Sequence, residues 1–216
     1  MMDFIRERVW RSAPYEIGEH QDMSDRLEAV LASIDAANDE DPHQVLQDGE
    51  SVARERLYGQ RMSAWLSRLA PEASEVLKIS ARGQHVRRWK IPRSDYPMDR
   101  AGYLKWRTTL YRFHADQLEP LMKAEAYPDA DIQRMRGLIE KRGIKTNPES
   151  QILEDVICLV FLEFYFDNFR GQHERAKVVD IVRKTWGKMS ERGQAFALQL
   201  PLNPEALGLI NEALGV

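Results

Sequence analysis

The sequence predicts an all-α fold, and three observations point to that class. Apolar residues recur at a spacing of about 3.6 residues along most of the chain, as at Leu27, Val30, Leu31 and Ile34. We find no strand-like alternation of apolar and polar residues and no internal repeat. With 216 residues, 43% hydrophobic and 30% charged, the chain is long enough to bury a substantial core. We therefore expect a helical bundle without a sheet.

The chain is expected to consist of an N-terminal extension, residues 1–22, followed by a single helical domain at 23–216. Ser24 is a suitable N-cap for the first helix, because its side-chain oxygen can accept a free backbone N–H. The acidic stretch from Asn38 to Glu50 contains a proline and a glycine. We therefore expect a loop there.

Two further helices are expected next. The first ends before Pro71, and the second starts in the turn formed by that proline and continues to about Trp89. The following stretch, Lys90–Asp99, holds two prolines and cannot be the interior of a helix. It is predicted to be a stiff loop that presents Arg93 and Tyr96.

The C-terminal part is predicted to be helical as well. Asp99 can cap a long helix, and an amphipathic helix follows at 131–142. Asn147 followed by Pro148 is a clear helix start. Residues 149–169 are apolar nearly all round, so we expect them to form the central, buried helix. Two or three amphipathic helices complete the chain.

The segment 82–112 is basic and aromatic in a chain whose net charge is −3. Guanidinium groups bind phosphates or carboxylates, and flat rings stack on bases, so this mixture favours a phosphorylated or nucleotide-like ligand. The alternative is a surface whose cations pair with acidic residues elsewhere in the chain. With Arg61 from the preceding helix, the predicted ligand contacts are Arg88, Trp89, Arg93, Tyr96, Arg100 and Arg107.

Two histidines, His85 and His114, lie at the inner edges of predicted helices in this segment, and Asp155 lies in the apolar helix. Neutral imidazole and carboxylate are common ligands of divalent transition metals. The predicted metal set is therefore His85, His114 and Asp155, with iron, manganese or zinc as the ion. The alternatives are satisfied core histidines and an acid that favours the N-terminal end of its helix.

The sequence lacks the motifs that are typical of several classes of enzyme. There is no phosphate-binding P-loop, dinucleotide fingerprint, nucleophile elbow or HExxH motif.

Cys158 is the only cysteine and lies in an apolar run, so we expect a buried, reduced thiol. The most apolar segment, 156–166, is too short to span a bilayer. The first residues lack the apolar core of a secretory signal, and we expect a cytoplasmic protein without a membrane partner.

Four segments carry a resemblance to a known family: DAANDEDP (35–42), LYGQRMSAWL (57–66), QHVRRWKIPRSDYPMDRAGYLKWRTTLYRFHA (84–115) and LEDVICLVFLEFYF (153–166). Together they closely resemble the family called Domain of Unknown Function four-two-zero-two, over about residues 25–215. The long third segment is the most specific of the four. The resemblance implies a soluble helical protein and no particular activity.

The chain also resembles, more weakly, the HD superfamily of metal-dependent phosphohydrolases. Tyr58 stands where the first motif has histidine, Gln84-His85 replaces the His-Asp pair, and Asp155 suits the last position. This resemblance implies an HD-like orthogonal bundle with Tyr58, His85 and Asp155 in catalytic positions. Because two of the usual ligand positions differ, the metal would be bound differently or would have been lost.

The function expected from these observations is binding of an anionic small molecule or nucleotide by an HD-like helical domain. If the protein is an enzyme, the expected reaction is phosphoester hydrolysis by a metal-activated water. The alternative is a non-catalytic module that binds RNA or another protein through the segment 82–112. The sequence predicts no oligomeric state.

Overall fold

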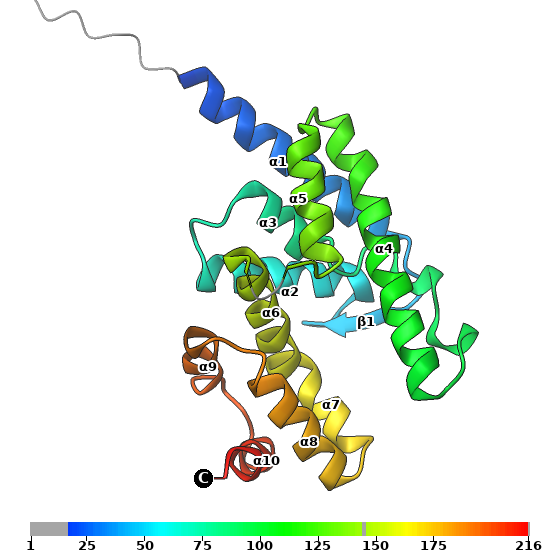
Figure 1. Ribbon diagram of the computed structural model, residues 1–216, viewed down its shortest axis with the longest axis vertical. Helices are drawn as coiled ribbons and strands as arrows, with labels where there is room; N and C mark the ends of the chain where they lie inside the picture. Colours follow the sequence, from blue (N-terminus) through cyan, green and yellow to red (C-terminus); the bar gives the residue numbers. More distant parts are fainter. Residues whose placement is uncertain (1–16, 144–145, 216) are drawn as a thin grey trace, which may run out of the picture.

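The computed structural model describes residues 17–143 and 146–215, and nearly all of its regular structure is helical (Figure 1). The all-α prediction is confirmed. In these residues the α-helices are α1 (Ile17–Asp39), α2 (Arg54–Leu69), α3 (Glu75–Arg82), α4 (Arg100–Ala124), α5 (Asp129–Ile139), α6 (Pro148–Val160), α7 (Phe166–Gly171), α8 (Arg175–Trp186), α9 (Glu191–Ala197) and α10 (Pro204–Leu214). Shorter turns are the 3₁₀ segments η1 (Arg88–Lys90) and η2 (Arg93–Asp95) and the π segment η3 (Phe161–Tyr165).

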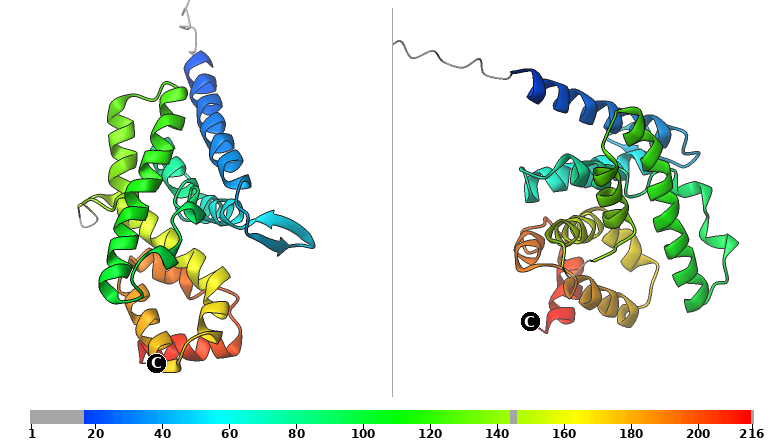
Figure 2. Two further views of the ribbon diagram at one scale, coloured as in Figure 1. Left: turned by 90° about the vertical axis from the view of Figure 1, so that its right-hand side faces the viewer. Right: turned by 45° about the horizontal axis from the view of Figure 1, so that its top comes forward.

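A small antiparallel hairpin stands where the sequence analysis predicted only a loop. Its strands are β1 (Gln44–Gln47) and β2 (Glu50–Ala53), and it projects from the side of the helical body (Figure 2). Asp48 and Gly49 form the turn with φ of 52° and 87°. Two successive positive φ values match the twist of hairpin strands, and Asp-Gly favours them. The prediction of a bundle without any sheet is therefore wrong for this hairpin, whereas the all-α class holds.

Several helix boundaries also differ from those predicted. Helix α1 begins at Ile17, so Ser24 lies inside it, whereas residues 1–16 of the predicted extension lie outside the described residues. Helix α3 begins after Ser74, whose Oγ accepts a hydrogen bond from Leu77 N at 3.2 Å. It ends at Arg82, and the chain then turns instead of continuing as a helix to Trp89.

Two predicted helix starts are confirmed in detail. Asp99 caps α4, with its Oδ1 accepting from Gly102 N at 2.7 Å, and Asn147 caps α6 in the same way through Glu149 N. The predicted central helix is the succession α6, η3 and α7. Val156, Leu159 and Phe166 on it are fully buried, which confirms the prediction of a central position.

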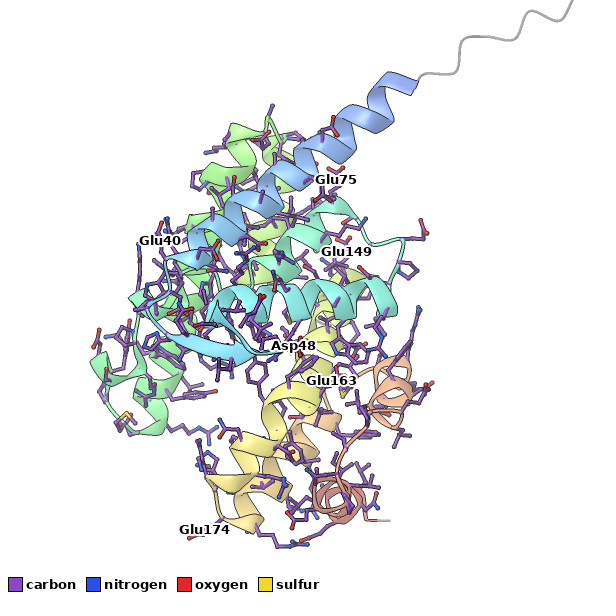
Figure 3. All side chains as sticks on the ribbon, turned by 180° about the vertical axis from the view of Figure 1, so that it is seen from behind. Glu40, Asp48, Glu75, Glu149, Glu163 and Glu174 are labelled. Carbon is purple, nitrogen blue, oxygen red and sulfur yellow. The ribbon has the colours of Figure 1, made fainter. Side chains whose placement is uncertain are left out.

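The helices pack around one apolar cluster that extends from α1 to α10. Helix α2 crosses α6 at a steep angle, α4 lies beside α5, and α8 packs against α10 (Figures 1 and 3). Glu163 lies where the central helix passes α2, and its Oε2 accepts a hydrogen bond from Trp65 Nε1 at 2.5 Å (Figure 3). The start of α4 and the loop before it face α2 and the central helix across a cavity, which is the candidate site.

Candidate functional site

A cavity of about 540 Å³ opens between α2, the α3–α4 connection, the start of α4 and the central helix. Its lining combines aromatic and basic side chains. The aromatic residues that line the cavity are Tyr58, Trp89, Trp106, Phe161 and Tyr165. The cations are Arg54, Arg88 and Arg93, and Glu55 is the only carboxylate among the described lining residues. We call this the first cavity.

Glu55, His85 and Tyr58 form a compact group at its base. The Nδ1 of His85 lies 3.1 Å from Glu55 Oε2, and the imidazole ring stacks on the Tyr58 ring with centroids 3.7 Å apart. Because an ionised carboxylate only accepts hydrogen bonds, Nδ1 carries the hydrogen and donates it. The Nε2 of His85 is then an acceptor, and Arg88 Nη1 lies 3.3 Å from it. The arrangement holds His85 in one tautomer.

Burial and charge keep the imidazole of His85 neutral. Burial lowers the pKa of His85 to about 4, and the positive charge of Arg88 acts in the same direction. Burial by itself would raise the pKa of Glu55, but the hydrogen bond from His85 and the charge of Arg88 outweigh it, and this pKa lies below its ordinary value. The pair is therefore a carboxylate beside a neutral imidazole at neutral pH.

Two buried polar residues at the end of α1 fix the backbone around this group. Asp41 Oδ2 accepts from Glu55 N at 3.2 Å. The amide of Asn38 donates to Glu55 O at 3.4 Å and accepts from Arg87 N at 2.9 Å. Arg87 has a φ of 51°, a left-handed conformation that costs a non-glycine residue energy. The contact with Asn38 thus stabilises the turn that directs Arg88 toward the cavity.

The close approach of α2 and α3 also depends on a residue without a side chain. A Cβ added at Gly59 would lie 2.8 Å from the carbonyl oxygen of Arg82. Arg82 in turn forms a bidentate pair with Asp35 of α1. Together these contacts hold the end of α3, and with it His85, against the α2 helix that carries Glu55.

A second cavity of about 230 Å³ adjoins the first, with which it shares His85, Arg88, Trp106 and Ile157. We call this the second cavity. Its cations besides Arg88 are Arg107, Lys141 and Lys188, and none of its described lining residues is a carboxylate. His114 lines it as well, and the centroids of the His85 and His114 rings are 6.1 Å apart. The two histidines therefore belong to one region, as the sequence predicted.

The predicted ligand contacts divide into two groups. Arg88, Trp89 and Arg93 line the first cavity, and Arg107 lines the second. The remaining three, Arg61, Tyr96 and Arg100, line neither cavity. Arg61 donates to Gln47 and lies over the Phe164 and Tyr165 rings, at 4.2 and 5.5 Å, and Arg100 is exposed at the start of α4.

Asp155 occupies a different environment from the histidines. Its Oδ1 accepts from Ser190 N at 2.7 Å and from Gln151 Nε2 at 3.0 Å, and its Oδ2 accepts from Ser190 Oγ. Ser190 is the N-cap of α9, so the carboxylate anchors the start of that helix. It lines neither cavity. The position predicted to be catalytic is therefore a structural one in this geometry.

The predicted metal set does not fit the residues that are present. In residues 17–143 and 146–215 no group of three His, Cys, Asp or Glu side chains is placed to hold a metal ion. Asp155 faces Ser190, while both nitrogens of His85 are engaged, one with a carboxylate and the other with a guanidinium. A cation at His85 would also lie beside Arg88. We derive no metal-dependent step from this site.

Glu55 is one of the site residues that sequence reasoning missed; others are Arg54, Trp106, Tyr165, Lys141 and Lys188. Glu55 lies in the first turn of α2 and is 4% exposed. An acid in a first turn ordinarily favours the helix dipole on the surface, and nothing local distinguishes this one from such an acid. The nearby stretch Asn38-Asp39-Glu40-Asp41 forms hydrogen bonds with the Glu55 backbone, but the sequence indicated only that it belongs to an acidic loop.

The molecule is thus an all-α domain with a composite aromatic and cationic site. A family model described as domain of unknown function (DUF4202) matches residues 28–210. Because this match covers most of the chain, the chain belongs to that family, as the resemblance indicated. No curated protein and no solved structure gives a significant match, and the likeness to the HD superfamily stays a prediction. None of the described helices combines the length and apolarity needed to cross a membrane.

Proposed function

We propose that this domain binds a phosphorylated molecule with an aromatic ring, such as a nucleotide, at the first cavity. Arg88 is the observation that carries the proposal. Its guanidinium is mostly buried, lies 4.8 Å from the centroid of the Trp106 ring and contacts His85. No carboxylate of the described residues lies at ion-pair distance from it; Glu55 acts on it from farther away, and that carboxylate is engaged by His85 and Arg54. Buried charges are normally paired, so a cation left in this state favours an anionic ligand.

The aromatic residues of the lining support the second half of the proposal. Trp89 and Trp106 line the cavity with Tyr165, and flat side chains of this kind stack on bases or other rings. The ring of the ligand would lie against these residues and its phosphate against Arg88. Arg93 has a different role, because it donates to the backbone carbonyls of Tyr96 and Pro97 and so holds the loop in shape.

Phosphoester hydrolysis is a second candidate, and the Glu55–His85 pair favours it. The Nε2 of a neutral imidazole can accept a proton from an attacking water, and Glu55 fixes the tautomer that this requires. Arg88 Nη1 lies close to Nε2, so a bound phosphate would first have to draw the guanidinium toward itself.

The proposal also includes a cytoplasmic location, with which the buried free thiol of Cys158 is compatible.

Calorimetric titration of the full chain with ribonucleoside 5′-mono-, di- and triphosphates tests the proposal. We expect Arg88→Gln to weaken binding about ten- to hundredfold, since it removes a charge-assisted contact. The matched control is Arg100→Gln, in the same basic segment but exposed and outside both cavities, which should leave the affinity unchanged. The same samples, followed for released phosphate, test hydrolysis.

Two results would contradict the proposal. One is equal weakening by both substitutions, which would mean that binding follows overall charge. The other is binding of single-stranded RNA without binding of any nucleotide in the panel, which would favour the RNA-binding alternative.

A further inference from the structure

The side chains that line the second cavity include several cations, and no carboxylate among the described lining residues balances them. Arg107 bonds to the Tyr111 hydroxyl, and the Lys188 ammonium has no side-chain partner among the described residues. Lys141 is paired with Glu154, which itself lies outside the cavity lining. The lining therefore provides several donors and positive charges to whatever enters.

Two hydrogen-bond acceptors in the same lining have no partner. His114 is 1% exposed, and its Nδ1 lies 2.9 Å from Val86 O. A carbonyl oxygen can only accept, so Nδ1 carries the hydrogen and Nε2 is left with a lone pair. That Nε2 and the Gln84 Oε1 are both buried without a hydrogen-bond partner. Buried polar atoms are ordinarily satisfied, so each unpaired acceptor points to a missing donor.

Cations together with unpaired acceptors select a particular kind of anion. The oxygens of a fully ionised oxyanion only accept hydrogen bonds, and one of them would face the lone pair of His114 Nε2. A phosphate group that keeps one proton satisfies both requirements, because its P–OH donates while its other oxygens accept from the cations. The second pKa of a terminal phosphate is about 6, so most of the free group has lost this proton at pH 7, but keeping it on binding costs only a small amount of free energy.

We infer that the second cavity is a subsite for the terminal phosphate of a phosphomonoester, bound with one proton shared between a phosphate oxygen and His114 Nε2. The inference rests on the proposed function, because Arg88 and His85 line both cavities. The ring of the ligand would occupy the first cavity and its terminal phosphate the second. A phosphodiester has no such proton and would fit less well.

The charges around His114 favour its role as an acceptor. His85 and Arg88 lie next to it with Glu55 behind them, and Arg107, Lys141 and Lys188 line the same cavity. Burial lowers the pKa of His114 to about 3, and the neighbouring His85 and Arg88 act in the same direction. The imidazole is therefore neutral before the ligand binds, and the proton in the complex is brought by the phosphate.

Comparison of inorganic phosphate with inorganic sulfate on the full chain tests the inference. The two anions are alike in shape, but sulfate has no proton at neutral pH. We expect phosphate to bind at least about tenfold more tightly than sulfate, because sulfate leaves the acceptor unpaired. His114→Asn should remove most of this preference, since asparagine can still donate to Val86 O but has no atom at the Nε2 position.

Arg107→Gln is the matched control. It should weaken both anions by a similar factor and leave their ratio unchanged, because it removes charge and no acceptor. If His114→Asn does not fold, Gln84→Met removes the other acceptor and should narrow the same ratio.

The outcomes separate this inference from the proposed function. Equal affinities of phosphate and sulfate for the unmodified protein, or a ratio that His114→Asn and Gln84→Met both leave unchanged, would overturn the subsite. If nucleotides still bind in a manner that depends on Arg88, the proposed function survives that failure. If neither the inorganic anions nor the nucleotides bind, both fall.

Discussion

Five of the nine cations of segment 82–112 form two groups that differ in their partners. In the paired group, Arg82 contacts Asp35, and both Arg87 and Lys90 contact Glu40 at the end of α1 (Figure 3). In the cavity group, Arg88 and Arg107 contact histidine, tryptophan and tyrosine side chains instead. The two groups are interspersed along the chain and are alike in composition. The local density of charge therefore does not separate the two groups, whereas the partners of each cation do.

Two buried acids show the same contrast. Asp155 has its oxygens filled by donors from Ser190 and Gln151 and serves the fold. Glu55 is equally buried, but it contacts His85 and lines a cavity that is open to a ligand. Only Asp155 lies in an apolar helix, which is why the sequence analysis connected it with function and passed over Glu55. These two contrasts lead to three predictions. Each tests whether a given side chain stabilises the fold or contributes to the candidate site.

The largest effect is expected from Asp155→Ala. This change leaves the Ser190 backbone N–H and hydroxyl without their acceptor, and we expect the free energy of unfolding to fall by about 4 kcal/mol. Chemical denaturation measures it. Gly193→Ala should act in the same direction, because its added Cβ would lie 2.7 Å from Asp155 Cγ. Phosphate affinity should be unchanged in whatever protein remains folded. A stable Asp155→Ala variant with lost phosphate binding would return Asp155 to the site.

The next effect concerns pH and His85. Its pKa of about 4 in the folded protein lies below the ordinary value of 6.5, so the unfolded chain takes up the proton first as the pH falls. The stability contributed by the neutral imidazole is thus complete above pH 6.5 and is lost between pH 6.5 and 4, by about 3 kcal/mol. His114 contributes with the same sign.

Urea denaturation between pH 4 and 7 checks this dependence. His85→Asn keeps a donor for Glu55 but cannot titrate, so its stability should fall less over this range than that of the unmodified protein. Identical slopes for the two proteins would mean that His85 is not held neutral by burial.

The smallest effect comes from a matched pair of neighbours, Arg87→Met and Arg88→Met. Arg87 forms a partly exposed ion pair with Glu40, so its loss should lower Tm by about 1–2 °C and leave nucleotide affinity unchanged. Arg88 is mostly buried and has no carboxylate at ion-pair distance among the described residues. Its replacement should leave Tm unchanged or raise it, while nucleotide affinity falls. A drop in Tm for Arg88→Met as large as that for Arg87→Met would remove the distinction between the two groups.

Some features of the fold were readable from the sequence because they depend on neighbours in the chain. Asp99 and Asn147 cap their helices as predicted, since a cap bonds to a backbone N–H only two or three residues away. The β1–β2 hairpin was also readable in principle. The Asp48-Gly49 pair is a strong hairpin signal, but it was interpreted only as a loop.

The sequence alone was enough to predict the helical class, the central apolar helix and the segment that supplies His85, His114 and three of the six described cations lining the two cavities. Those properties follow from periodicity and local charge. The packing of the helices determines that Asp155 faces Ser190, that Glu55 contacts His85, and which arginines lack a carboxylate partner. Such pairings join residues 30 or more positions apart, as in Glu55 with His85 and Asp155 with Ser190. They depend on how helices cross, and no local pattern of residue types encodes that geometry.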